Sequence, residues 1–92
     1  MTSYEFEVAA KNAVIQYAQS HYGETWNIHD IHLMFFDHML EYQRAIMIDS
    51  GMNTRYYEVT YDAHENVMYV DIYEQAYSIT VPGDDLDFKV HE

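Results

Sequence analysis

The sequence of 92 residues contains no cysteine, one proline, three glycines and four basic side chains. Without cysteine, a disulfide framework, thiolate catalysis and cysteine-ligated zinc are excluded. The glycines, Gly23, Gly51 and Gly83, stand far apart, so they cannot form the glycine-rich loop that cradles phosphates. These absences argue against an enzyme that uses a nucleotide or a reactive thiol.

Positive charge is equally scarce. Sixteen acidic side chains against four basic ones give a formal net charge of −12. Proteins that contact phosphates need cations to displace counterions, so this charge opposes direct binding to nucleic acid or to an anionic membrane. The charge favours a basic protein surface as the partner.

Long apolar runs are missing as well. No run approaches the ~20 residues of a membrane span, and residues 1–7 lack the basic segment and apolar stretch of a signal peptide. We therefore expect a cytoplasmic protein that makes no membrane contact.

The composition is nevertheless that of a folded protein, with 49% apolar and 16% aromatic residues. The length suits one domain. We predict a single α+β domain over residues 1–83, followed by a short acidic C-terminal tail over residues 84–92. In this domain, one N-terminal helix packs on an antiparallel sheet of three to five strands.

Residues 2–22 have the pattern of an amphipathic helix. Apolar side chains recur at helical spacing on one face, at Phe6, Ala10, Ala13, Val14, Tyr17 and Ala18. Thr2 and Glu5 have capping-box spacing, and Gly23 is placed to end the helix in a left-handed turn. The apolar face is expected to pack on the sheet.

The stretch 27–50 fits two structures. Ile31, Leu33 and Phe35 alternate as in a strand. Helical spacing also fits, through Ile31, Phe35, His38, Tyr42 and Ile46. Because residues 45–48 are rich in β-branched side chains, we predict two strands at about 30–39 and 44–50, while a helix over 30–48 stays open.

Residues 56–62 and 67–73 are rich in strand formers, and the four residues between them suit a hairpin loop. The register that joins the apolar side chains pairs Asp62 with Val67, Tyr61 with Met68, Val59 with Val70, and Tyr57 with Ile72. We expect Phe6, Val14 and Tyr17 of the helix to pack on this face.

After residue 73 the apolar side chains shift to the other set of alternate positions. Tyr77, Ile79 and Val81 alternate with polar residues and predict a further strand after a bulge or bend near 74–76. Pro82 and Gly83 would end that strand.

Three histidines, His29, His32 and His38, raise the question of a metal site. On a strand, His29 and His32 point to opposite faces, and their spacing matches no helical metal-binding pair. Solvated or hydrogen-bonded imidazoles explain them better, so we expect no metal and no other cofactor. A domain of this size offers little depth for a substrate cleft, and we predict that the protein is not an enzyme.

The face of the hairpin turned away from the helix is the candidate site. There the register opposes Tyr56 to Tyr73 and Glu58 to Asp71, and like charges directly opposite one another destabilise a sheet. Arginine from a partner would pair with these acids and stack on the rings, although an ordinary solvated sheet face fits the same pattern. The candidate partner-binding residues are Tyr56, Glu58, Tyr69, Asp71 and Tyr73, with Asp84, Asp85 and Asp87 of the tail as further acidic candidates.

Four short segments between Ile28 and Glu74 carry a family likeness: Leu40, Arg44-Ala45, Tyr56-Tyr57-Glu58-Val59-Thr60-Tyr61 and Tyr69-Val70-Asp71-Ile72-Tyr73. In these segments the chain resembles a family of short proteins of unknown function encoded by phages and prophages of Gram-positive bacteria. The resemblance implies a phage context and no particular activity.

A phage context suggests a binding function for the acidic charge, because small acidic phage proteins often occupy the nucleic-acid-binding surfaces of host proteins. We therefore expect a non-enzymatic, anti-defence inhibitor that mimics nucleic acid in the host cytoplasm. Its partner would be a basic, nucleic-acid-handling host protein such as a nuclease or a CRISPR effector. The alternative is a small homo-oligomeric accessory or ligand-binding protein of phage metabolism, which leaves a homodimer open.

Overall fold

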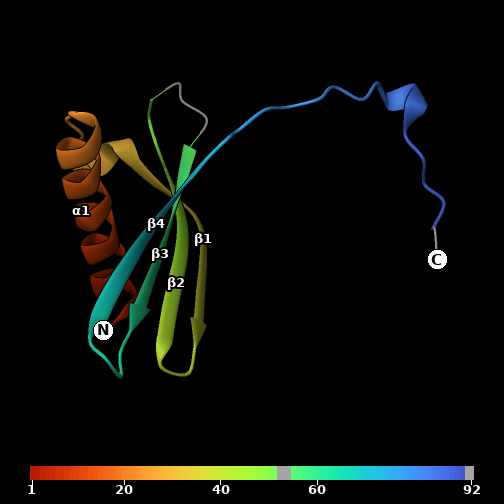
Figure 1. Ribbon diagram of the computed structural model, residues 1–92. Coiled ribbons are helices and arrows are strands. Elements are labelled where there is room, and N and C mark those ends of the chain that lie inside the picture. Colours follow the sequence, from red (N-terminus) through yellow and green to blue (C-terminus); the bar gives the residue numbers. More distant parts are fainter. Residues whose placement is uncertain (52–54, 91–92) are drawn as a thin grey trace.

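Helix α1 (Ser3–Tyr22) lies against one face of a four-stranded antiparallel sheet (Figure 1). The strands are β1 (Ile31–Met39), β2 (Tyr42–Asp49), β3 (Arg55–Asp62) and β4 (Val67–Glu74), and they follow one another in the sheet in chain order. Two short 3-10 helices, η1 (Ile28–Asp30) and η2 (Gly83–Asp85), complete the elements. The structure is a computed structural model and describes residues 1–51 and 55–90. The predicted α+β arrangement of one N-terminal helix on an antiparallel sheet is confirmed.

Helix α1 has the predicted caps. The Thr2 hydroxyl accepts a hydrogen bond from the Glu5 backbone N–H at 3.1 Å, and the Glu5 carboxylate accepts one from the Thr2 backbone N–H at 2.8 Å. At the other end, Gly23 adopts the left-handed conformation with φ 69°, which glycine enters without steric cost. Among the described residues, no helix combines the length and the apolar character that crossing a bilayer requires.

A β-bulge in β1 interrupts the predicted alternation of its apolar side chains. Pairing with β2 shifts register between Leu33 and Phe35, so Met34 is an extra residue. The side chains on the helix side are therefore Ile31 and Leu33 before the bulge and Phe36 after it. Phe35, which was predicted to alternate with Ile31 and Leu33, lies on the opposite face because of the extra residue. The strands are confirmed, with β2 beginning at Tyr42 rather than at residue 44.

The turns that join the strands contain two residues with positive φ. Leu40, between β1 and β2, has φ 49°, and Asn66, between β3 and β4, has φ 53°. Asparagine visits the left-handed region readily, whereas for leucine this region costs about 1–2 kcal/mol. Leu40 is also 96% exposed, so burial does not offset the strain.

The predicted register of the second hairpin is confirmed. In β3 and β4, Tyr61 faces Met68, Val59 faces Val70 and Tyr57 faces Ile72.

The core fills the space between α1 and the sheet. Its fully buried members are Phe6, Ala10, Val14, Ile31, Ala45, Met47, Tyr57 and Val59. Val70 and Ile72 pack against them, which confirms the predicted inner face. Tyr17 lies at the margin instead, half-buried and stacked on His21 with ring centroids 5.0 Å apart.

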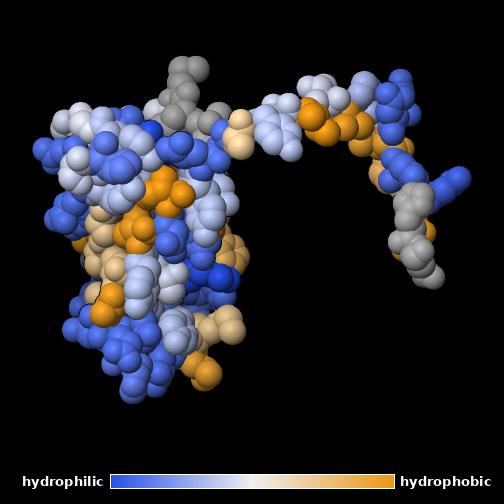
Figure 2. Space-filling model, viewed as in Figure 1, coloured by the Kyte–Doolittle hydropathy of each residue, from blue (hydrophilic) through white to orange (hydrophobic). Residues whose placement is uncertain are grey.

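The chain beyond β4 leaves the folded body as an extended tail (Figure 1). The predicted strand through Tyr77, Ile79 and Val81 is wrong: residues 75–82 form no strand, and all three side chains are exposed. Hydrophobic side chains stand out along this tail in Figure 2. The domain boundary predicted at residue 83 stays a prediction, and residues 91–92 of the predicted acidic tail lie outside the described residues.

Candidate functional site

The sheet face turned away from α1, here called the outer face, is covered by no other element of the described chain. Its side chains come from alternate strand positions, and apart from the buried Asp62 near the hairpin turns they are exposed or half-exposed. They include Phe35, Asp37 and Met39 of β1, Tyr42, Arg44 and Ile46 of β2, Tyr56, Glu58 and Thr60 of β3, and Tyr69, Asp71 and Tyr73 of β4. An exposed surface with this many large apolar side chains is typical of interaction sites.

Five predicted site residues gather on the β3–β4 half of the outer face. Glu58 faces Asp71 across the two strands, and Tyr56 faces Tyr73 in the predicted register. The two tyrosine rings are stacked, with centroids 5.0 Å apart and 14° between their planes. The negative charge of Glu58 raises the pKa of Tyr73, with burial and Asp71 adding to the shift. Tyr69 lies on the same face, opposite Thr60 of β3.

Arg44 of β2 also belongs to this site, although it was not among the predicted site residues. Its guanidinium lies 4.0 Å from the Glu58 carboxylate and 3.8 Å from that of Asp37. Exposed pairs at such distances contribute at most about 1 kcal/mol each. Arg44 therefore partly relieves the repulsion at Glu58, while no salt bridge among the described residues involves Asp71.

A hollow of about 250 Å³ opens on the outer face beside Arg44. It is lined by Asp37, Met39, Tyr42, Arg44, Glu58 and Thr60. Its volume is below the roughly 300 Å³ at which sites for small molecules begin. Its two carboxylates, Asp37 and Glu58, both contact Arg44, so this chain supplies the guanidinium that the hollow holds.

The acidic tail residues are not brought to this face. Asp84 and Asp85 lie in η2 and Asp87 follows it, on the tail that extends away from the sheet (Figure 1). The Asp87 carboxylate accepts a hydrogen bond from the Lys89 backbone N–H at 2.9 Å. The predicted site residues therefore form two separate groups.

The histidines do not converge. His32 Nε2 lies 2.8 Å from the Ser50 hydroxyl, and His29 and His38 are exposed. Within residues 1–51 and 55–90, no three histidine, aspartate or glutamate side chains are placed to share a metal ion.

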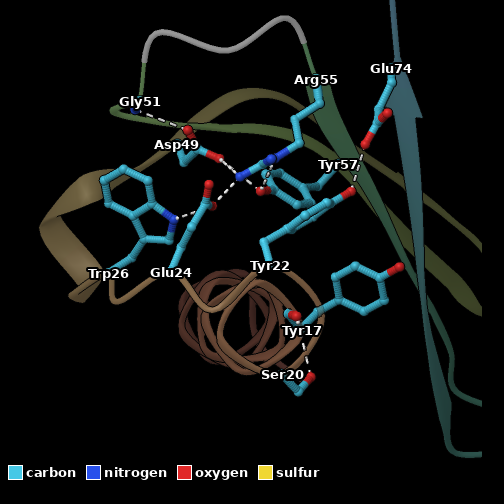
Figure 3. A network of polar contacts seen from close by, with 10 residues as sticks. All are labelled: Tyr17, Ser20, Tyr22, Glu24, Trp26, Asp49, Gly51, Arg55, Tyr57 and Glu74. Carbon is cyan, nitrogen blue, oxygen red and sulfur yellow. Dashed lines mark hydrogen bonds and ion pairs between the residues drawn. The ribbon is translucent and has the colours of Figure 1, made fainter.

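A second polar cluster joins the loop after α1 to strands β2 and β3 (Figure 3). The Arg55 guanidinium pairs with Glu24 and lies 3.5 Å from the Asp49 carboxylate. Its Nε donates a hydrogen bond to the Tyr57 hydroxyl at 3.0 Å. Burial lowers the pKa of Arg55, but the Tyr57 hydrogen bond and the neighbouring charges outweigh it and raise the pKa.

Asp49 is the buried centre of this cluster. It accepts hydrogen bonds from the Tyr57 hydroxyl at 2.7 Å and from the Gly51 backbone N–H at 2.9 Å. Burial, together with the hydrogen bond to Asp49, raises the pKa of Tyr57 to about 12. Because the side chains of Asp49 and Arg55 are only 1% and 9% exposed, this cluster holds the fold together and offers little surface to a partner.

Sequence reasoning missed Asp49 and Arg55, which lie at strand ends. The available signal was Arg55 itself. In a chain with four basic and sixteen acidic residues, each basic side chain is expected to pair with a carboxylate.

Comparison with known proteins gives a family and no activity. The sequence model of a family of unknown function (DUF6275) matches residues 7–83. No curated protein and no solved structure matches the chain. The matched segment includes all four strands and the outer face, and it ends before Asp84.

Proposed function

We propose that this chain, which belongs to the DUF6275 family of unknown function, is a non-enzymatic binding protein whose outer face takes a basic segment of a nucleic-acid-handling protein. The observation that carries the proposal is the facing pair Glu58 and Asp71, flanked by the stacked rings of Tyr56 and Tyr73 on an uncovered sheet face. Like charges placed opposite one another destabilise the free protein. A cation supplied by a partner removes this cost.

Arginine is the side chain that fits this surface best. Asp71 is exposed and stands beside Tyr69 and Tyr73, so a guanidinium can pair with the carboxylate while it lies on a ring. Arg44 itself lines the adjacent hollow and contacts both of its carboxylates, Asp37 and Glu58. Asp71 is therefore the outer-face carboxylate to which a cation of a basic segment adds.

The net charge of −12 supports a partner that normally binds nucleic acid. Carboxylates spaced along a strand present negative charge to a surface evolved to contact phosphates, and they raise the association rate at low salt. Within this proposal, the protein is a phage-encoded, anti-defence inhibitor in the cytoplasm of the host, and a nuclease or a CRISPR effector is the partner of choice. Competition with nucleic acid for one basic surface is the proposed mode of inhibition.

The test compares two double variants with the same change in charge. Glu58→Gln/Asp71→Asn removes two carboxylates from the outer face, and Glu41→Gln/Glu65→Gln removes two from exposed positions in the strand-connecting turns. Immobilised parent protein and both variants are incubated with host lysate at low and high salt, and the captured proteins are then challenged with DNA.

We expect the parent to retain a basic nucleic-acid-binding protein at low salt and to release it to DNA. The outer-face variant should bind this protein more weakly by about 2–5 kcal/mol, while the control variant binds nearly as the parent does. Equal binding by the parent and both variants would refute the outer face as the site. In that case a third variant, Asp84→Asn/Asp85→Asn/Asp87→Asn, tests whether the tail carries the binding instead.

A further inference from the structure

Strand β1 forms an outer edge of the sheet beside an open groove. Within the described residues, β1 pairs with β2 on one side and with no strand on the other. Between α1 and this free edge lies a groove of about 540 Å³. Its lining includes the apolar side chains Tyr4, Val8, Ile28, Ile31 and Leu33. An edge strand next to apolar side chains is a template for pairing with a further strand.

At the other edge of the sheet, β4 likewise pairs with no further strand among the described residues, but the space between it and α1 is filled. Next to β4, the rings of Tyr17 and Tyr22 occupy the space between α1 and the strand (Figure 3). The Tyr22 hydroxyl donates a hydrogen bond to the Glu74 carboxylate at 2.7 Å, which ties the end of α1 to β4. The groove beside β1 is therefore the better acceptor for an added strand.

The tail contains a segment with the sequence of a strand and no partner. Tyr77, Ile79 and Val81 alternate with Ser78 and Thr80. These three residues are 83%, 80% and 52% exposed, and Figure 2 shows hydrophobic side chains along the tail. Period-two alternation of this kind marks a strand with one buried face. In the single copy, residues 77–81 therefore contact no surface that would bury their apolar side.

The segment cannot reach the groove of its own molecule. From Glu74 to Tyr77 the chain spans three residue steps, or at most about 11 Å. A strand added outside β1 lies four strand spacings from β4, or roughly 19 Å. A fold back onto β4 is also disfavoured, because Gln75 and Ala76 are not the residues that tight hairpin turns require.

We infer that residues 77–81 of a second copy of this chain add to the free edge of β1 as a fifth strand, with Tyr77, Ile79 and Val81 in the groove beside α1. The bulge at Met34 bends β1 just after the groove, so the added strand runs beside Ile31–Leu33 and the turn before it. A two-fold axis makes each copy donor and acceptor at once, which closes the assembly as a dimer.

The polar lining of the groove does not oppose this pairing. It consists of Lys11, Glu7, His29 and His32, so it carries little of the net charge of −12. The donated segment is followed by Asp84 and Asp85. Lys11 is paired with Glu7 at 2.9 Å in the single copy, and an aspartate from the donor adds to this ion pair. The inference goes beyond the proposed function, because the outer face remains open in the dimer.

The first test measures the mass of the full chain in solution across concentrations, for the parent and two single variants. Ile79→Asp places a charge on the side of the tail that faces the groove. Thr80→Asp places the same charge at the next position, which faces away. Both residues lie on the tail, so neither change disturbs the packed core, and circular dichroism verifies the fold.

We expect a dimer for the parent and for Thr80→Asp, and a dimer dissociation constant raised at least about 30-fold for Ile79→Asp. A parent that remains a monomer at high micromolar concentration would overturn the inference. So would equal dimerisation of all three proteins, or equal loss of the dimer in both variants.

The second test locates the donated strand, and the absence of native cysteine makes it simple. Thr80→Cys carries a spin label in one unlabelled copy, which is refolded together with ¹⁵N-labelled parent protein. Broadening of the Ile31, His32 and Leu33 signals in the labelled copy is the expected result. Broadening confined to β4, or to Tyr56 and Tyr73 of the outer face, would assign the tail to another surface and overturn the inference.

Discussion

The guanidinium carbon of Arg55 lies 3.8 Å from the centre of the Tyr22 ring. This contact joins the last residue of α1 to the first residue of β3. Since Arg55 also pairs with Glu24 and Asp49, one side chain connects the helix, the loop after it and two strands (Figure 3).

Replacing Arg55 should therefore be costly. Arg55→Met removes the cation from the buried Asp49 carboxylate, and breaking a buried pair in this way lowers the free energy of unfolding by about 3–5 kcal/mol. Urea denaturation of the variant measures the loss. Arg44→Met is the matched control, because Arg44 is half-exposed and its loss should change the free energy of unfolding by less than about 1 kcal/mol.

Tyr57 should make the protein sensitive to high pH. Its pKa is about 12 in the folded protein, compared with about 10 for an unperturbed tyrosine. Folding therefore favours the protonated hydroxyl, and this stabilisation is complete below pH 10 and is lost as the pH rises through 12. Melting temperatures between pH 9 and 12 should show the decline. Tyr22 and Tyr73 shift in the same direction, so the comparison is with Tyr57→Phe, in which the decline should be shallower.

Gln43 marks a site where stability can be gained. Its side chain is 4% exposed on the inner face of β2, and its amide nitrogen has no hydrogen-bond partner among the described residues. An unsatisfied buried polar group costs about 1–3 kcal/mol, so Gln43→Met should raise the free energy of unfolding by about 1 kcal/mol or more. Gln16→Met, at an exposed position of α1, should change it by less than about 0.5 kcal/mol. No gain at Gln43 would show that the amide is satisfied in solution.

Removing the charge of Asp71 and removing the charge of Glu58 should have different effects on the free energy of unfolding. Asp71→Asn removes the repulsion with Glu58 and no salt bridge of the described residues, so it should raise stability by a few tenths of a kcal/mol. Glu58→Gln removes the same repulsion together with the contact to Arg44, and it should be nearly neutral. Thermal melting at low salt resolves the two variants, and added salt should reduce the difference. A larger gain at Glu58 would mean that Arg44 does not act on it.

Sequence alone predicts the features that depend on neighbours along the chain. The caps of α1 at Thr2 and Gly23 need residues within one turn, and the β3–β4 register follows from side chains on two strands joined by a short loop. The bulge at Met34 was not predicted, because the extra residue shows only through its pairing with β2.

The candidate site was predicted in part for the same reason. Tyr56, Glu58, Tyr69, Asp71 and Tyr73 come together because the register of one hairpin is enough to align them. Arg44 and Asp37 join them through β1 and β2, whose register the sequence left open. The strand predicted at 77–81 is wrong because alternation describes the kind of surface that a segment suits and does not say whether the rest of the fold offers that surface.

The strained Leu40 also has a practical meaning for protein engineering. Its backbone favours glycine or asparagine and its side chain is open to solvent, so Leu40→Gly removes a conformational penalty without leaving a cavity. Position 40 is thus, together with Gln43, a candidate for a thermostabilised version of this protein. An assay of partner capture by that version would then separate what this leucine costs the fold from what it does in recognition.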